Sequence, residues 1–200
     1  MAQGRTCQLK IGNLESHVYS LLPNIIKDAQ QVDHNAIINF SDGRSSRTAK
    51  PPGFYPFTVK ERGNESHGII IQKKKVPSGY RYYIFDPNGK KWANTSGYSL
   101  KIRMKEKMYP LYKTISPDKS WNASGNCGLW SIVMAIIFDS NYKPSQLKKI
   151  YKTFDKIGNS WMNQLKKIYI ENTPMQYNTA NQAKIFIQGV KGMIQDIINS

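Results

Sequence analysis

The chain has 200 residues, of which 40% are hydrophobic and 12% aromatic, and this suits one globular domain rather than a disordered tail protein. Lys and Arg number 29 against 13 Asp and Glu, so the net charge is +16 and a polyanion is the natural partner. A solvated surface rich in lysine is the alternative interpretation of the same charge.

The first third of the chain combines a helical pattern with an extended segment. Leu14 to Gln31 predicts a helix that Pro23 interrupts, and Ala36 to Phe40 predicts an extended segment. The following residues, Ser41 to Gly53, are rich in Ser, Arg and Pro and predict a loop.

The centre of the chain indicates a β-sheet. Five short segments are rich in β-branched and aromatic residues and are separated by Gly, Pro, Asn and Ser, which is typical of strands. The predicted strands are Tyr55–Lys60, His67–Lys73, Tyr80–Asp86, Ser99–Arg103 and Met108–Ile115.

The last third of the chain is predicted to be helical. Cys127 to Phe138 is almost entirely apolar and indicates a buried helix. Pro144 and Gly158 mark the start and end of an amphipathic helix, and another helix is predicted from Ser160 to about Ile170. A final helix carries one apolar stripe, made of Ala183, Ile187, Val190, Ile194 and Ile197. The fold class is therefore α+β.

The pentapeptide Leu-Lys-Lys-Ile-Tyr occurs twice, at residues 147–151 and 165–169. Two similar amphipathic helices in a hairpin, with the lysines facing solvent, is one interpretation. A shared phosphate-binding face is the other. The lysines concerned are Lys148, Lys149, Lys166 and Lys167.

The number of cysteines and the hydropathy of the chain restrict the cellular compartments in which we expect the protein. Two cysteines, Cys7 and Cys127, exclude a disulfide framework, and no Cys or His spacing is typical of a metal site. No apolar run follows Met1, and the longest apolar stretch, Ile132 to Phe138, is too short to span a bilayer. We therefore expect a protein of a reducing compartment that is not secreted and has no membrane partner.

A histidine and an aspartate lie at the outer ends of two strands that we expect to form a hairpin. If the turn is centred between Val76 and Pro77, His67 lies directly opposite Asp86, and a slip of two residues would leave a diagonal contact. The carboxylate could then orient the imidazole. Asp86 also opens an Asp-Pro-Asn-Gly turn, so capping that turn is its alternative role.

Cys127 lies at the predicted start of the buried helix, where the helix N-terminus favours a thiolate. A small buried hydrophobe is the alternative interpretation. His17 and His34 have ordinary surroundings, which makes His67 the candidate base. In a Cys–His–acid arrangement His67 would take the thiol proton, Asp86 would fix its tautomer, and backbone N–H groups would hold the oxyanion.

The order of these residues resembles a clan of cysteine peptidases that contains adenovirus protease, proteases of large DNA viruses and the SUMO proteases. The segments that carry the resemblance are Ser66–Ile70, Tyr82–Gly89 and Gly125–Trp130. The clan usually has a Gln six or seven residues before the cysteine to line the oxyanion hole. Because this chain has Trp121 and Ser120 there, Asn122 becomes the candidate donor, together with the backbone N–H of Cys127.

The resemblance implies a central mixed, mainly antiparallel sheet flanked by helices. It also implies a single cysteine-protease domain over residues 1–200. Within it we expect an N-terminal helix and loop region (1–54), a catalytic core (55–138) and C-terminal helices (139–200).

The compact chain and its charge are similar to viral maturation proteases that use nucleic acid as a cofactor. The resemblance implies a monomeric cysteine endopeptidase that cuts capsid or core precursors after small residues, in the virion and in the host cytoplasm or nucleus. No cofactor is required for the chemistry, and DNA is a candidate activating polyanion. Two alternatives stay open: an effector of the same clan that removes ubiquitin-like modifiers or transfers acetyl groups, and a non-enzymatic basic nucleic-acid-binding domain.

Overall fold

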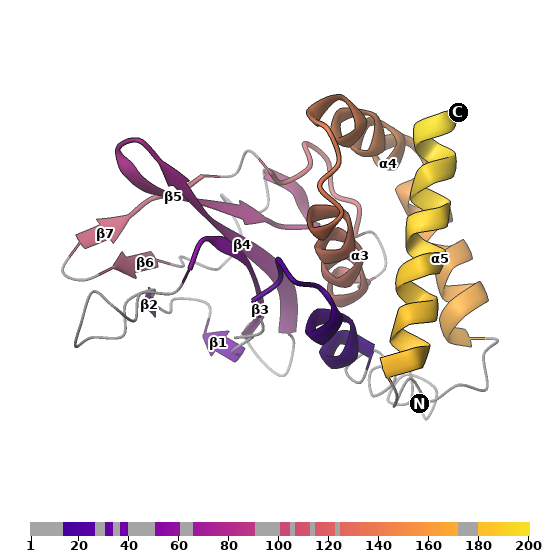
Figure 1. Cartoon of the computed structure of the whole chain (residues 1–200), viewed down its shortest axis with the longest axis horizontal. Helices are drawn as coiled ribbons and strands as arrows, with labels where there is room; N and C mark the ends of the chain where they lie inside the picture. The colour runs from indigo at the N-terminus through magenta and orange to yellow at the C-terminus, as the bar shows by residue number, and fades with distance from the viewer. Residues whose placement is uncertain are drawn as a thin grey trace. The chain divides into compact units, whose positions relative to one another are not determined.

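The structure is a computed structural model, and the chain divides into two compact units that we describe separately. The first unit comprises Met1–Ile25 and Trp121–Ser200, and the second comprises Ile26–Ser120. The residues that the structure describes are 14–26, 31–33, 37–39, 51–60, 66–90, 101–104, 107–112, 115–122, 125–171 and 180–200. Both units are drawn in Figure 1, which labels the helices and strands. The single domain over 1–200 stays a prediction.

The second unit contains two sheets. A five-stranded mixed sheet has the order β1-β3-β4-β5-β8, in which β3, β4 and β5 are antiparallel while β1 and β8 run parallel to their neighbours. Its strands are β1 (Gln31–Asp33), β3 (Gly53–Lys60), β4 (Ser66–Val76), β5 (Gly79–Phe85) and β8 (Leu111–Tyr112). A three-stranded sheet has the order β2-β6-β7. Its strands are β2 (Ile37–Asn39), β6 (Lys101–Met104) and β7 (Lys107–Tyr109).

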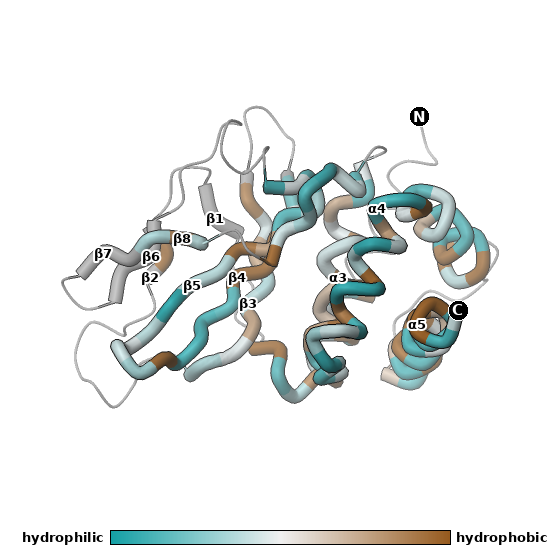
Figure 2. The backbone as a smooth tube through the Cα atoms, turned by 90° about the horizontal axis from the view of Figure 1, so that it is seen from above, coloured by the Kyte–Doolittle hydropathy of each residue, from teal (hydrophilic) through white to brown (hydrophobic). Residues whose placement is uncertain are grey.

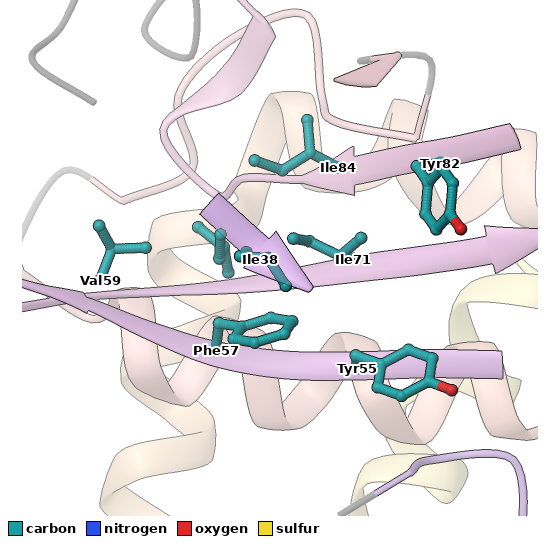
Figure 3. Close-up of a cluster of buried hydrophobic side chains, with 8 residues drawn as sticks. Ile38, Tyr55, Phe57, Val59, Ile71, Tyr82 and Ile84 are labelled. Carbon is teal, nitrogen blue, oxygen red and sulfur yellow. The ribbon is translucent and has the colours of Figure 1, made fainter. Parts of the chain in front are cut away.

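One face of the large sheet forms the core of this unit. Alternate residues of β3, β4 and β5 point to this face, as the two-residue period of a strand requires, and they pack with Ile38 of β2 (Figure 3). Burying each large apolar side chain contributes about 1.5–3 kcal/mol. The buried residues are Ile38, Tyr55, Phe57, Val59, Ile69, Ile71, Tyr82 and Ile84.

The first unit is helical. A short helix covers residues 14–21, and it is followed along the chain by α3 (Cys127–Asp139), α4 (Pro144–Lys166), the π-helical turn η2 (Lys167–Glu171) and α5 (Ala180–Asn199). Helix α3 is buried from Leu129 to Ile137. Helix α5 contacts both α3 and α4, and its hydrophobic residues recur at helical spacing (Figure 2). The predicted stripe on α5 is confirmed, since all five of its residues are buried.

The structure corrects the predicted helix boundary at Gly158. Helix α4 runs through this glycine without a break, so the two pentapeptide copies lie on one helix and its π-helical continuation, and the predicted helical hairpin is wrong. Gly158 is buried inside the helix and faces the ring of Trp130, where an added Cβ would make an ordinary contact of 3.5 Å. The glycine packs against an aromatic side chain and does not end the helix.

Two further boundaries differ from prediction. The chain around Gln31 is strand β1 and not the end of a helix, whereas the described N-terminal helix ends before Pro23, where the interruption was predicted. The predicted strand from Met108 to Ile115 is divided into β7 and β8, because Pro110 lacks the N–H that a ladder needs. Most of the predicted loop before Gly53 lies outside the described residues.

The α+β class is confirmed, and strands β3, β4, β5, β2 and β6 and helix α3 lie where the sequence predicts them. Among the described helices, none has the length and apolar character required to cross a membrane.

Candidate active-site residues

The β4–β5 hairpin determines where the candidate base and its orienting carboxylate lie. Val76 pairs with Gly79 and Ile71 pairs with Ile84, so the turn residues are Pro77 and Ser78. The predicted register is therefore wrong by two residues. Proline cannot donate to the ladder and is excluded from it, while Gly79 takes a φ of +120° that allows strand β5 to start at once.

The shift by two residues keeps His67 and Asp86 on the same face of the sheet. Asp86 follows Phe85, which pairs with Ile70, so the carboxylate is diagonal to His67 rather than opposite it. The atoms His67 Nε2 and Asp86 Oδ1 are 2.8 Å apart. The two residues are only 3% and 0% exposed, so this contact is shielded from water. The diagonal contact is the predicted outcome of such a slip.

The Asp86 carboxylate makes the contacts that both of the alternative roles left open by the sequence require. Its Oδ1 atom contacts the imidazole and also accepts a hydrogen bond of 2.8 Å from the backbone N–H of Asn88. The Asp86 carbonyl accepts from the N–H of Gly89 at 3.0 Å and closes the turn. A buried carboxylate needs such donors because desolvation without them is costly. One side chain thus caps the turn and orients the ring.

Ser116 is a positioning residue that sequence reasoning missed. Its Oγ accepts a hydrogen bond of 3.0 Å from the backbone N–H of Asp86 and donates one of 2.6 Å to the carbonyl of Ile84. The side chain is 2% exposed. A lone serine 30 positions after the aspartate gives no pattern that could have revealed this contact.

The chain around Ser116 is attached to the turn at several further points. The N–H of Lys90 donates to the carbonyl of Pro117 at 2.8 Å, and its ammonium group contacts Asp118 at 2.7 Å. Gly89 has a φ of +87°, and a Cβ there would lie 3.0 Å from the backbone of Lys119. Only glycine suits both this conformation and this approach. The end of β5 is therefore held by residues 116–119.

Cys127 is the first residue of α3 and is half-buried. Asn126 is the N-cap residue, and its carbonyl accepts the N–H of Trp130 at 2.9 Å. No acidic residue lies in the first turn, so no carboxylate there opposes the positive end of the helix dipole. This environment favours a thiolate and presents the backbone N–H groups of a first helical turn.

Aromatic packing fixes the chain just before Cys127. The indole N–H of Trp121 donates to the Asp155 carboxylate at 2.9 Å. The backbone carbonyl of Trp121 accepts the indole N–H of Trp130 at 3.0 Å. The Trp121 ring lies 5.2 Å from Trp130 and 5.0 Å from Tyr151. Burial first, and the charge of Asp155 second, raise the pKa of Tyr151, which keeps its hydroxyl protonated. Phe154 and Trp161 complete this cluster.

The remaining predicted site residues lie as follows. Asn122 is half-buried and immediately follows the fixed Trp121. Lys148, Lys149 and Lys167 are exposed, whereas Lys166 is half-buried, 3.9 Å from Glu171. His17 is half-buried in the helix over 14–21; His34 and Cys7 lie outside the described residues.

The structure brings His67 and Asp86 together within the second unit. Cys127 belongs to the first unit, and its convergence with this pair stays a prediction. Within the described ranges, no group of three or more His, Cys, Asp or Glu residues is arranged to hold a metal ion.

Comparison with models of known protein families gives no match to this chain, and comparison with functionally curated proteins gives no significant relative.

Proposed function

We propose that the protein is a cysteine endopeptidase with Cys127 as nucleophile, His67 as base and Asp86 as the residue that orients the base. The observation that carries the proposal is the buried contact of 2.8 Å between His67 Nε2 and Asp86 Oδ1. They are the histidine and the aspartate of the ordered His, Asp, Cys pattern in the sequence. The finer fold proposed with this function is that of the adenovirus-protease and SUMO-protease clan.

The contact determines what the imidazole can do. A carboxylate that accepts a hydrogen bond from Nε2 keeps the proton of the neutral ring there, so Nδ1 carries the lone pair. Nδ1 then takes the proton of Cys127, and the thiolate attacks the substrate carbonyl. The resulting imidazolium returns the proton to the leaving amine, and water hydrolyses the thioester. The N–H of Cys127 and the amide of Asn122 are the proposed oxyanion donors.

The proposed substrates are capsid or core precursors during virion maturation, cut after small residues such as Gly. We propose DNA as an activating polyanion, bound by the lysine pairs of the two pentapeptides. The copies start 18 residues apart, which is five turns of an α-helix, so equivalent residues lie on one side of the helix about 27 Å apart. The alternative of a shared basic face is therefore favoured over the helical hairpin.

Alkylation of the thiols tests the assignment directly. We expect iodoacetamide at mildly acidic pH to label Cys127 faster than Cys7, which serves as an internal reference thiol when labelled peptides are quantified by mass spectrometry. His67→Ala should slow Cys127 to the rate of Cys7, whereas the matched variant His17→Ala should leave its rate unchanged. Equal and slow labelling of Cys127 with and without His67 would favour the non-enzymatic alternative.

Substrate class needs a second experiment. We expect the protein to cut peptides from a mixed library after small residues and Cys127→Ser to cut none. Efficient reaction of Cys127 with a ubiquitin or SUMO vinyl probe, without cleavage of the library, would instead support the alternative in which the enzyme removes ubiquitin-like modifiers.

A further inference from the structure

The large sheet has a second face that changes character along β4 and β5. Ile70 and Phe85 pair across the two strands and are fully buried on this face. The next pair, Gln72 and Tyr83, is half-buried, and the pair after it, Lys74 with Arg81, is exposed. Figure 2 shows the hydrophilic residues at the hairpin end of both strands. The same sheet face is therefore core at one end and solvent-facing at the other.

A pair of tyrosines occupies this solvent-facing end. Tyr112 of the edge strand β8 pairs with Tyr83, and their ring centroids lie 5.6 Å apart at an angle of 42°. Tyr112 is 41% exposed. The guanidinium of Arg81 lies 5.9 Å from the centre of the Tyr112 ring. Lys74 pairs with Arg81 across the hairpin.

We call these residues the tyrosine platform: Gln72, Lys74, Arg81, Tyr83 and Tyr112. The platform carries two cations and no acid. The acidic side chains whose surroundings the structure describes in this unit are paired elsewhere, Asp86 with His67 and Asp118 with Lys90. The platform thus joins positive charge to one exposed and one half-buried tyrosine ring.

We propose that the tyrosine platform binds single-stranded nucleic acid, with bases stacking on Tyr83 and Tyr112 and phosphates contacting Arg81 and Lys74. Every base has a π-face that can stack on an aromatic ring, and positive side chains neutralise the backbone. A duplex keeps its base faces stacked inside, so it offers phosphates and base edges to the same surface but no base face for a ring to stack on. An acidic peptide satisfies the charges and leaves the rings without a stacking partner. The combination of rings and cations therefore favours a single strand.

This site is independent of Cys127 and distinct from the lysines of α4, so it can be tested separately from the proposed peptidase. The probe is a fluorescent 12-nucleotide oligothymidylate, compared with a duplex of the same length, and affinity is measured by anisotropy at several salt concentrations. We expect Tyr112→Ala to weaken single-strand binding about tenfold and duplex binding less than twofold. Tyr112→Phe retains the ring and should bind as the unchanged protein does.

A second matched pair of variants tests how much charge contributes to single-strand binding. Arg81→Gln should weaken single-strand binding and lower its salt dependence by about one released counterion. Lys184→Gln removes one exposed charge from α5 and should change single-strand binding less than twofold.

Three results would overturn the proposal: unchanged single-strand binding in Tyr112→Ala, an equal loss of duplex and single-strand binding in that variant, or displacement of the oligonucleotide by polyglutamate at equal charge concentration. Labelling of Cys127 in Tyr112→Ala reports on the peptidase proposal alone, because the platform contains no proposed catalytic residue.

Discussion

Around His67 and Asp86 the chain is held by hydrogen bonds, whereas around Cys127 it is held by aromatic packing. The carboxylate of Asp86, its backbone N–H and its carbonyl all have polar partners within the unit of residues 26–120. The start of α3 instead follows Trp121, which packs between aromatic rings. A hydrogen bond depends on one donor atom and one acceptor atom, so exchanging a single atom changes the orientation that the bond sets. Packing depends on the volume of buried side chains, so removing a large side chain changes the position of the chain. The two regions should therefore respond differently to substitution.

The largest expected effect is on activity, in Asp86→Asn. An amide in place of the carboxylate has no negative charge to stabilise an imidazolium, and its NH2 group can donate to Nε2 and so select the tautomer with the proton on Nδ1. We expect the cleavage rate to fall about 10²–10⁴-fold while the protein remains folded. Peptide-library cleavage and circular dichroism measure the two properties. Full activity in the variant would remove Asp86 from the proposed mechanism.

Asp86→Asn is expected to lower activity and leave the protein folded. Removing the aromatic packing around Trp130 should instead lower the stability of the fold. Trp130 is fully buried and contacts Trp121, Phe154 and Trp161. We expect Trp130→Ala to lower the free energy of unfolding by about 3–5 kcal/mol, measured by urea denaturation.

The matched control for that variant is Ile157→Ala on α4, whose side chain is 47% exposed and should cost less than about 0.5 kcal/mol. Equal stability of the two variants would show that the cluster does not support α3.

Ser116→Ala tests whether the hydroxyl positions Asp86. It removes the acceptor of the buried Asp86 N–H, and we expect the free energy of unfolding to fall by about 1–3 kcal/mol. A positioning role also requires a lower rate of Cys127 labelling at mildly acidic pH. Ser160→Ala on α4 removes an exposed hydroxyl that donates to a carbonyl of its own helix, and should change neither quantity. Loss of stability with unchanged labelling would make the role of Ser116 purely structural.

The smallest expected effect concerns Gly158. A Cβ there would lie 3.5 Å from Trp130 and 3.7 Å from Phe154, which are ordinary contacts. Because glycine inside a helix is less favourable than alanine, Gly158→Ala should stabilise the protein by about 0.5–1 kcal/mol, measured as a higher midpoint of urea denaturation. Gly158→Leu should destabilise it, since the longer side chain would displace the ring of Trp130. A lower midpoint of urea denaturation in Gly158→Ala would contradict a continuous α4.

The sequence by itself determined the elements whose pattern is local. The apolar run after Cys127 predicted a helix that is buried on all sides. The stripe on α5 predicted a helix that buries one side, because such a helix repeats its apolar residues every three or four positions. The β-branched and aromatic residues of β4 and β5, with turn residues between them, predicted a hairpin that keeps His67 and Asp86 on one face. The two-residue period of a strand preserves that relation through an even slip.

Only the tertiary structure decided the features that depend on distant partners. The register followed from excluding Pro77 from the ladder, and the position of Asp86 depends on Ser116, which lies 30 positions away. Helix α4 continues through Gly158, which packs beside the ring of Trp130. Grouping the first 25 residues with those after 120 likewise has no local signal. Contacts between residues far apart in the chain are set by side-chain shape and by the need to satisfy buried polar groups, and neither leaves a period in the sequence.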